Sequence, residues 1–203
     1  MKLAIVNLKG GTGKTTSAVY LALGMMQHGR TLLIDADPQG SSLSWSEGAK
    51  DFPLPVIGLP VKDLHKRVGQ FARDYTHIVI DTPPGEIAIV RSALLSADAA
   101  LLPIPPSLLD LDRLRPTLEL LEEVEHFNGI AIHVLLTRVR RGTKSATAAR
   151  EVLNELGLPI LNAEVPLLEA YSASFGLVPD DLAEYQAAVD ELMKGADMKG
   201  IGQ

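Results

Sequence analysis

Short apolar runs alternate along this chain with longer segments in which apolar residues recur every three or four positions. Runs such as Ile78-Val79-Ile80 are apolar throughout, as in strands buried on both faces of a parallel sheet. The longer segments have the periodicity of amphipathic helices. This alternation predicts an α/β fold, a mostly parallel twisted sheet with helices on both faces. The predicted strands cover residues 2–8, 31–35, 77–81, 99–104, 130–137 and 160–165, and the predicted helices cover residues 14–28, 62–73, 87–97, 110–127, 144–156 and 181–194.

Length and composition predict one domain over residues 1–203, because 46% hydrophobic residues can bury a sizeable core and no segment resembles a linker. The proline-rich segment 51–60 is expected to be an irregular connection. Cysteine is absent, which excludes disulfides, thiolate metal sites and cysteine nucleophiles, and suits a reducing cytoplasm. No apolar run is long enough for a signal peptide or a membrane span, so we expect no membrane insertion.

A phosphate-binding loop is predicted at residues 9–15, which read Lys-Gly-Gly-Thr-Gly-Lys-Thr between the first strand and the first helix. The glycines let backbone N–H groups approach phosphate oxygens closely. Lys14 can reach the β- and γ-phosphates, and the Thr15 hydroxyl can ligate Mg²⁺. The sequence therefore predicts a site for a nucleoside triphosphate and magnesium.

Two aspartates stand at the ends of later strands. Asp35 follows Leu32-Leu33-Ile34 and Asp81 follows Ile78-Val79-Ile80. Ligands of doubly wound sheets bind outside the carboxyl ends of the strands, so both aspartates should converge on the phosphate loop. There Asp81 is placed to coordinate Mg²⁺ through a water, and Asp35 to tune the magnesium shell.

Three motifs in order resemble those of the ParA/MinD family of P-loop ATPases. The loop is similar to the deviant Walker A motif K-G-G-x-G-K-[ST]. The usual Walker A motif, G-x-x-x-x-G-K-[ST], would have glycine at position 8, where this chain has Leu8. Residues 32–40 resemble the Asp-x-Asp-Pro-Gln switch I segment, and residues 78–85 resemble Walker B and switch II. The small ParA partition and positioning ATPases are the most similar subgroup. The resemblance implies a nucleotide site formed by Lys9, Gly10, Gly11, Thr12, Gly13, Lys14, Thr15, Thr16, Thr137, Arg138 and Pro166, with Thr15, Asp35 and Asp81 at the metal.

The resemblance also implies catalytic roles. Lys9 would cross to the nucleotide of a second subunit, so that an ATP-bound homodimer sandwiches two nucleotides. Lys14 would hold the phosphates, and Asp37 would orient the attacking water. ATP is favoured over GTP, because the late strand ends Leu135-Leu136-Thr137-Arg138 and lacks an Asn-Lys-x-Asp motif. Thr137, Arg138 and Pro166 would then lie beside the adenine.

A basic segment suggests what the ATPase acts on. The net charge of −6 argues against nucleic-acid binding by the molecule as a whole. Between residues 138 and 150, however, no acidic residue occurs, and ParA-type dimers bind DNA without sequence preference through basic residues. The candidate DNA-binding residues are Arg140, Arg141, Lys144 and Arg150. The acidic residues Glu119, Glu122, Glu123 and Glu125 are expected on the outer face of their helix, where they could contact a basic partner.

The leading hypothesis is an ATPase that partitions a plasmid or chromosome, or positions a large cargo over the nucleoid. A ParB-like or cargo-adaptor protein would stimulate hydrolysis. A MinD-like division-site regulator is disfavoured, because residues 191–200 are too rich in glycine and too sparsely basic for a membrane-binding helix. A metabolic ligase or synthetase of the superfamily is disfavoured by the Lys9 signature and the Asp-Pro-Gln segment.

Overall fold

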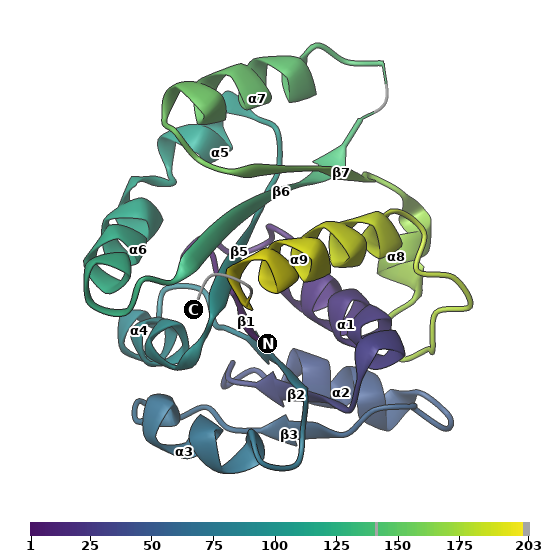
Figure 1. The fold of residues 1–203 in the computed structure, drawn as a ribbon. Helices are drawn as coiled ribbons and strands as arrows, with labels where there is room; N and C mark the ends of the chain where they lie inside the picture. The colour runs from purple at the N-terminus through teal and green to yellow at the C-terminus, as the bar shows by residue number, and fades with distance from the viewer. Residues whose placement is uncertain (141, 201–203) are drawn as a thin grey trace.

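One parallel sheet organises the chain in the computed structural model, which describes residues 1–140 and 142–200. Within those residues the sheet has seven strands in the order β3-β2-β4-β1-β5-β6-β7, and every neighbouring pair is parallel (Figure 1). This confirms the predicted α/β fold class. The strands are β1 (Lys2–Ile5), β2 (Thr31–Asp35), β3 (Val56–Gly58), β4 (His77–Asp81), β5 (Ala99–Ile104), β6 (Ala131–Val139) and β7 (Ile160–Pro166).

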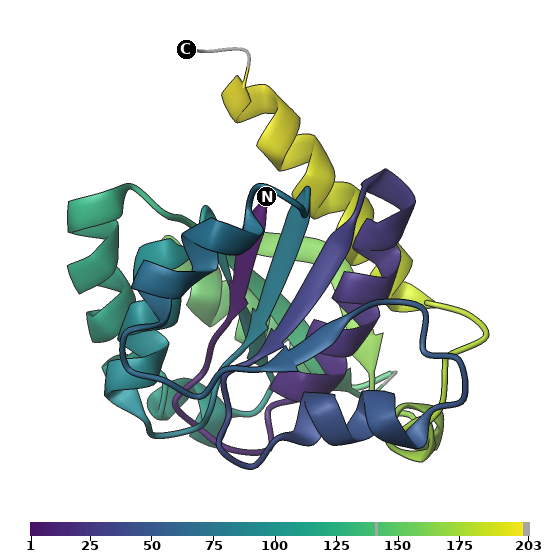
Figure 2. The ribbon, with the colours of Figure 1, turned by 90° about the horizontal axis from the view of Figure 1, so that it is seen from below.

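Helices cover both faces of the sheet (Figure 2). On one face α1 and α9 pack on a core that includes Leu3, Ile5 and Leu101. On the other face α3, α4 and α6 cover Ala4 and the remaining apolar side chains. The helical elements are α1 (Lys14–Met25), the 3₁₀ turn η1 (Met26–His28), α2 (Ser41–Gly48), α3 (Leu64–Phe71), α4 (Ile87–Ser96), α5 (Leu108–Asp112), α6 (Arg115–Asn128), α7 (Ser145–Glu155), α8 (Glu169–Ala173) and α9 (Glu184–Gly200).

Several boundaries differ from the sequence-based prediction. The predicted irregular segment 51–60 contains β3, a three-residue strand at the sheet edge, where flanking prolines cost no ladder hydrogen bond. The predicted helix 110–127 is two helices, α5 and α6. Pro116 lacks the N–H that would continue α5, and it is tolerated in the first turn of α6. The short helices α2 and α8 were not predicted.

The described helices include none with the length and apolar character needed to cross a bilayer.

Candidate nucleotide-binding site

The loop between β1 and α1 leaves its backbone donors free for a ligand. Gly13 caps α1 with φ 92°, and Gly11 has φ 75°, so both adopt left-handed conformations that favour glycine. No side chain caps the helix, and its first turn contains no acidic residue. The first N–H groups of α1 and the positive end of its dipole therefore face the loop, as an anion site requires.

Lys14 lies over this loop. Its side chain is buried, and Nζ donates a hydrogen bond to the Lys9 carbonyl at 3.0 Å. Burial lowers the pKa of Lys14, while the charges of Asp81 and Asp37 oppose that shift. The ammonium group is thus held between the phosphate loop and the aspartates, where it can neutralise a bound polyphosphate.

The two strand-end aspartates are neighbours, as the topology rule predicted. Asp35 and Asp81 are register partners on the adjacent strands β2 and β4, and both are buried. Asp35 accepts hydrogen bonds from the backbone N–H groups of Asp37 and Leu43 at 3.1 and 2.9 Å. Ser42 Oγ donates to one oxygen of Asp81 at 2.8 Å. The other oxygen, Oδ1, has no hydrogen-bond partner among the described residues.

This arrangement fits a magnesium ion shared with a bound phosphate. The described residues contain no group of three or more His, Asp or Glu side chains that could hold a metal alone. Mg²⁺ commonly takes one or two carboxylates and completes its shell with phosphates and water. The unpartnered Oδ1 of Asp81, and the Thr15 hydroxyl that lowers the pKa of this carboxyl group, supply ligands of that kind.

Burial raises the pKa of Asp81 to about 7, although hydrogen bonds from Ser42 and Thr15 oppose the shift. Burial also raises the pKa of Asp35. Without a metal, Asp81 therefore keeps its proton up to a pH well above the range in which carboxyl groups usually ionise. A divalent cation would favour the charged form and displace that proton.

Asp81→Asn should stabilise the metal-free, nucleotide-free protein more at about pH 8 than at about pH 5. Between the unfolded pKa of 3.8 and the folded pKa of about 7, the folded state holds a proton that the unfolded state releases. The free energy of unfolding consequently falls as pH rises through this window, and an amide avoids that loss. Thermal melts in a chelator measure both proteins. An equal gain at the two pH values would contradict the raised pKa.

Asp37 lies just beyond β2, in the turn that leads to α2. Its side chain is half-buried, and its Oδ1 accepts a hydrogen bond from the Gln39 N–H at 2.9 Å. Gly40, with φ 65°, ends the turn and begins α2. The charge of Asp37 acts on Lys14, so the turn holds this carboxylate beside the phosphate loop. The structure thus brings Asp37 to the same site as Asp35 and Asp81.

Two of the residues predicted to lie beside the adenine, Thr137 and Arg138, contact the phosphate loop, although they follow it by more than a hundred positions in the sequence. Thr137 Oγ1 donates to the Thr12 carbonyl at 2.9 Å, and Arg138 Nη1 donates to the Gly11 carbonyl at 2.8 Å. A cavity of about 150 Å³ opens beside them. It is lined by Gly13, Thr16, Thr137, Arg138, Val165, Pro166, Leu167, Leu168, Tyr171, Ser172 and Tyr185.

Sequence reasoning missed the two tyrosines of this cavity. Tyr185 is buried, its hydroxyl lies 3.0 Å from Ser17 Oγ, and its ring stacks on Tyr20 with centroids 4.9 Å apart. Tyr171 donates a hydrogen bond to Glu184. Tyr171 lies in α8 and Tyr185 in α9, outside any motif, so no local pattern indicated that they line this cavity.

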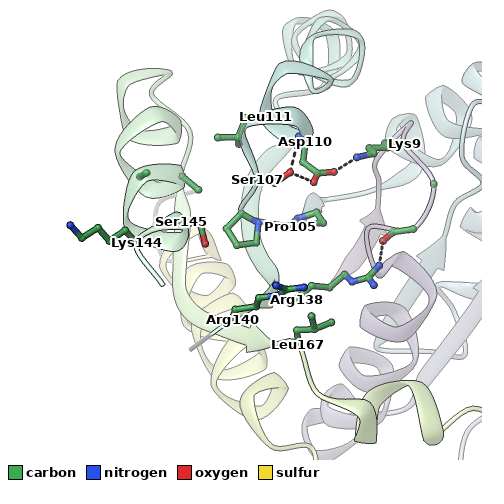
Figure 3. A pocket seen from close by; sticks show the side chains of 15 residues that line it. Lys9, Pro105, Ser107, Asp110, Leu111, Arg138, Arg140, Lys144, Ser145 and Leu167 are labelled. Atoms are coloured by element: carbon green, nitrogen blue, oxygen red, sulfur yellow. Dashed lines mark hydrogen bonds and ion pairs between the residues drawn. The ribbon is translucent and has the colours of Figure 1, made fainter. Parts of the chain in front are cut away.

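Lys9 lies on the other side of the loop, in the wall of a larger cavity of about 800 Å³ (Figure 3). Its ammonium group forms an ion pair with Asp110 of α5, and Ser107 Oγ hydrogen-bonds the same carboxylate. Ser107 also caps α5 by accepting from the Asp110 N–H at 3.1 Å. Asp110 was not predicted, although a serine three residues before an acidic residue at a helix start is a recognisable capping pattern.

The candidate DNA-binding residues do not all share one environment. Arg140 and Lys144 line the larger cavity (Figure 3). Arg141 lies outside the described residues. Arg150 departs from the expectation of a free basic side chain, because its guanidinium pairs with Glu164 at 2.7 Å and donates to the Leu161 carbonyl. Arg150 therefore ties α7 to β7.

The fold and the loop define a nucleotide-binding protein of the P-loop type. Residues 3–176 match the family described as the CobQ/CobB/MinD/ParA nucleotide binding domain. The chain belongs to this family.

Named relatives agree with that assignment, and solved structures share the fold. Maintenance of carboxysome distribution protein A of Gloeobacter kilaueensis is 37% identical over 84% of this chain and 77% of its own length. Chromosome partitioning protein ParA of Caulobacter vibrioides is 28% identical over 81% of this chain and 79% of its own. An ATP complex of Cyanothece McdA superposes with a TM-score of 0.79 at 22% identity, covering 95% and 96% of the two chains. The septum site-determining protein MinD of Pyrococcus horikoshii, complexed with Mg-ADP, gives a TM-score of 0.77 at 23% identity, covering 98% of each.

Proposed function

We propose that this chain is a magnesium-dependent ATPase of the ParA type, which forms an ATP-bound homodimer and positions a large cargo. The observation that carries the proposal is the pair of lysines in one phosphate loop. Lys14 lies over its own loop, whereas the ammonium group of Lys9 is directed to Asp110, on the wall of the neighbouring cavity. A second cation at that edge is suited to act on another subunit.

Each part of the site has a role in phosphoryl transfer. The N–H groups at the start of α1 and Lys14 would hold the triphosphate, and Thr15 and Asp81 would hold Mg²⁺. When bound, Mg²⁺ would neutralise negative charge on the phosphates. Asp37, held beside the loop by its turn, would orient the attacking water. Asp35 supports this arrangement through hydrogen bonds to the backbone of the switch segment.

Lys9 would complete the site in trans. In a sandwich dimer its ammonium group would exchange Asp110 for the γ-phosphate region of the opposite subunit. A cation delivered into a water-poor interface stabilises the charge of the transition state only after assembly. Hydrolysis is thereby coupled to dimerisation, and loss of the γ-phosphate would release the dimer.

The cargo hypothesis draws on the relatives. One relative is named for carboxysome distribution and another for chromosome partitioning, and the first is the more identical of the two. We therefore favour positioning of a carboxysome-like protein body over plasmid partition. A cargo-adaptor protein would stimulate hydrolysis, and the nucleoid would be the track. Arg140 and Lys144 are the described residues proposed to contact DNA, with Arg141 beside them in the sequence.

Duplex DNA of arbitrary sequence should bind the ATP state and not the ADP state. Pairing two weak patches in one dimer raises the avidity for a single duplex. Asp37→Ala traps the ATP state, and Arg140→Ala combined with Lys144→Ala should weaken binding by about tenfold or more and reduce its salt dependence. Binding is measured by fluorescence anisotropy at fixed moderate salt.

A matched control removes the same charge elsewhere. Lys50 and Lys66 are exposed and have no ion pair among the described residues, so replacing both with alanine should leave DNA binding unchanged. An ATP dimer that ignores DNA would rule out the nucleoid as the track. The ATPase assignment would survive that result.

A further inference from the structure

A second hollow lies beside the amino end of β6, whereas the nucleotide site lies at the carboxyl ends of the strands. It has a volume of about 730 Å³ and lies between the C-terminal ends of α6 and α7, beside the first residues of β6. In Figure 1, α6 and α7 border this part of the sheet on the left and at the top. We call it the α6–α7 groove. It is lined by Leu118, Leu121, Glu122, Glu125, Gly129, Ile130, Ala131, Ile132, His133, Leu156, Gly157, Leu158 and Pro159.

One large apolar side chain stands exposed in the wall of this groove, and a second lies in the hollow next to it. Leu156, in its wall, is 56% exposed. Phe127 is 76% exposed, and it lines an adjoining hollow together with Glu122. The described core is complete without these two side chains, since neither belongs to a buried cluster. Leu156 and the half-buried Leu118, Ile132 and Leu158 give the groove an apolar lining that a ligand could cover.

Two glutamates line the groove together with His133. No lysine or arginine lines it, and the sequence contains none between residues 116 and 137 or between residues 151 and 193. Glu119 and Glu123 on α6 are paired with arginines at 2.9 and 2.8 Å. Glu122 and Glu125, which line the groove, are exposed and have no ion-pair partner among the described residues.

These two carboxylates oppose the stability of their own helix. Glu122 lies three residues from both Glu119 and Glu125, and like charges at this spacing repel on a helix surface. Glu125 is in the last turn of α6, where the helix dipole favours cations. No cation within α6 pairs with these two carboxylates, and they complement a positively charged partner.

We propose that the α6–α7 groove docks a cationic amphipathic segment of a partner protein. Its apolar side chains would enter between Leu156 and Ile132, and its Lys or Arg side chains would pair with Glu122 and Glu125. The groove is built at the amino ends of the strands, whereas the nucleotide site is at their carboxyl ends. Docking is therefore independent of nucleotide and of the proposed ATP dimer, so a partner bound here stays attached through the ATPase cycle.

A designed peptide provides the probe. It has about 18 residues, roughly five helical turns, with Leu on one face and Lys on the other, and it carries a fluorophore. The full chain should bind it saturably with one peptide per protomer, equally in ADP and in ATP, in a fluorescence anisotropy titration. A second peptide keeps every Lys and replaces each Leu with Ser, and it should not bind.

Variants locate the site. Glu122→Gln combined with Glu125→Gln should weaken binding by about fivefold, as expected for two exposed ion pairs. The control Glu47→Gln with Asp74→Asn removes the same charge from exposed positions elsewhere and should change nothing. Leu156→Ser should weaken binding without unfolding the protein, since this side chain is more than half exposed. Circular dichroism and retained nucleotide binding verify the fold of each variant.

Three results would overturn the proposal. The serine peptide could bind as tightly as the leucine peptide, which would mean charge attraction alone. The control variant could weaken binding as much as the groove variant, which would place the peptide elsewhere. Sedimentation could show concentration-dependent self-association that Leu156→Ser abolishes, which would make the groove an interface between copies of this chain. None of these results bears on the proposed ATPase, because nucleotide turnover is measured separately.

Discussion

Lys9→Ala should lower ATP turnover by about 10³-fold while leaving ATP affinity nearly unchanged, because a cation supplied in trans acts on the transition state of an assembled dimer. The substitution spares the backbone of the loop, and Lys14 keeps its acceptor, which is the Lys9 carbonyl. Phosphate release measures turnover, and a fluorescent ATP analogue measures binding. Unchanged turnover would contradict the role of Lys9.

Mixing two inactive variants distinguishes a trans role from a cis role. In a mixed dimer of Lys9→Ala and Asp37→Ala protomers, the site on the Lys9→Ala protomer keeps its own Asp37 and receives Lys9 from the other subunit. Activity should therefore return on mixing, to a fraction of the wild-type rate set by the share of mixed dimers. If Lys9 acts on the nucleotide of its own subunit, every site lacks one group and mixing restores nothing.

Asp37→Ala should reduce hydrolysis by about 10²-fold to 10⁴-fold and accumulate the ATP-bound dimer, because the attacking water loses its orienting carboxylate. The buried aspartates and Lys14 remain, so ATP and Mg²⁺ should still bind. Single-turnover hydrolysis and size-exclusion chromatography in ATP measure the two effects.

Asp37→Asn is the matched control for this prediction. The amide oxygen can still accept the hydrogen bond from the Gln39 N–H, so the turn before α2 is preserved. An asparagine variant as inactive as the alanine variant assigns the loss to the carboxylate. Near-normal turnover in Asp37→Asn would instead make the residue a support of the switch turn.

Local sequence pattern identified the long elements of this fold and missed the short ones. Long apolar runs predicted the central strands because a strand buried on both faces must be apolar throughout. The edge strand β3 was missed because Val56 and Ile57 are only partly buried, Gly58 is exposed, and prolines lie on both sides. Helices α2 and α8 were missed because eight and five residues give too little periodicity to recognise.

The sequence by itself determined the phosphate loop and the aspartates of the switch segments. Glycine permits the left-handed backbone of the loop whatever the rest of the fold is. The carboxyl ends of parallel strands lie at the same end of a sheet, so residues that follow those strands lie close together. Gly11, Gly13, Asp35 and Asp81 were therefore predictable from neighbouring residues alone.

Only the tertiary structure decided which distant residues join that site. Asp110 pairs with Lys9 across 101 positions, and Thr137 bonds to Thr12 across 125. Arg150 was removed from the basic surface by Glu164, a residue of the next strand. The physical reason is that periodicity and turn chemistry act over only a few residues. The contacts between distant residues depend instead on the order of the strands in the sheet, which differs from their order along the chain.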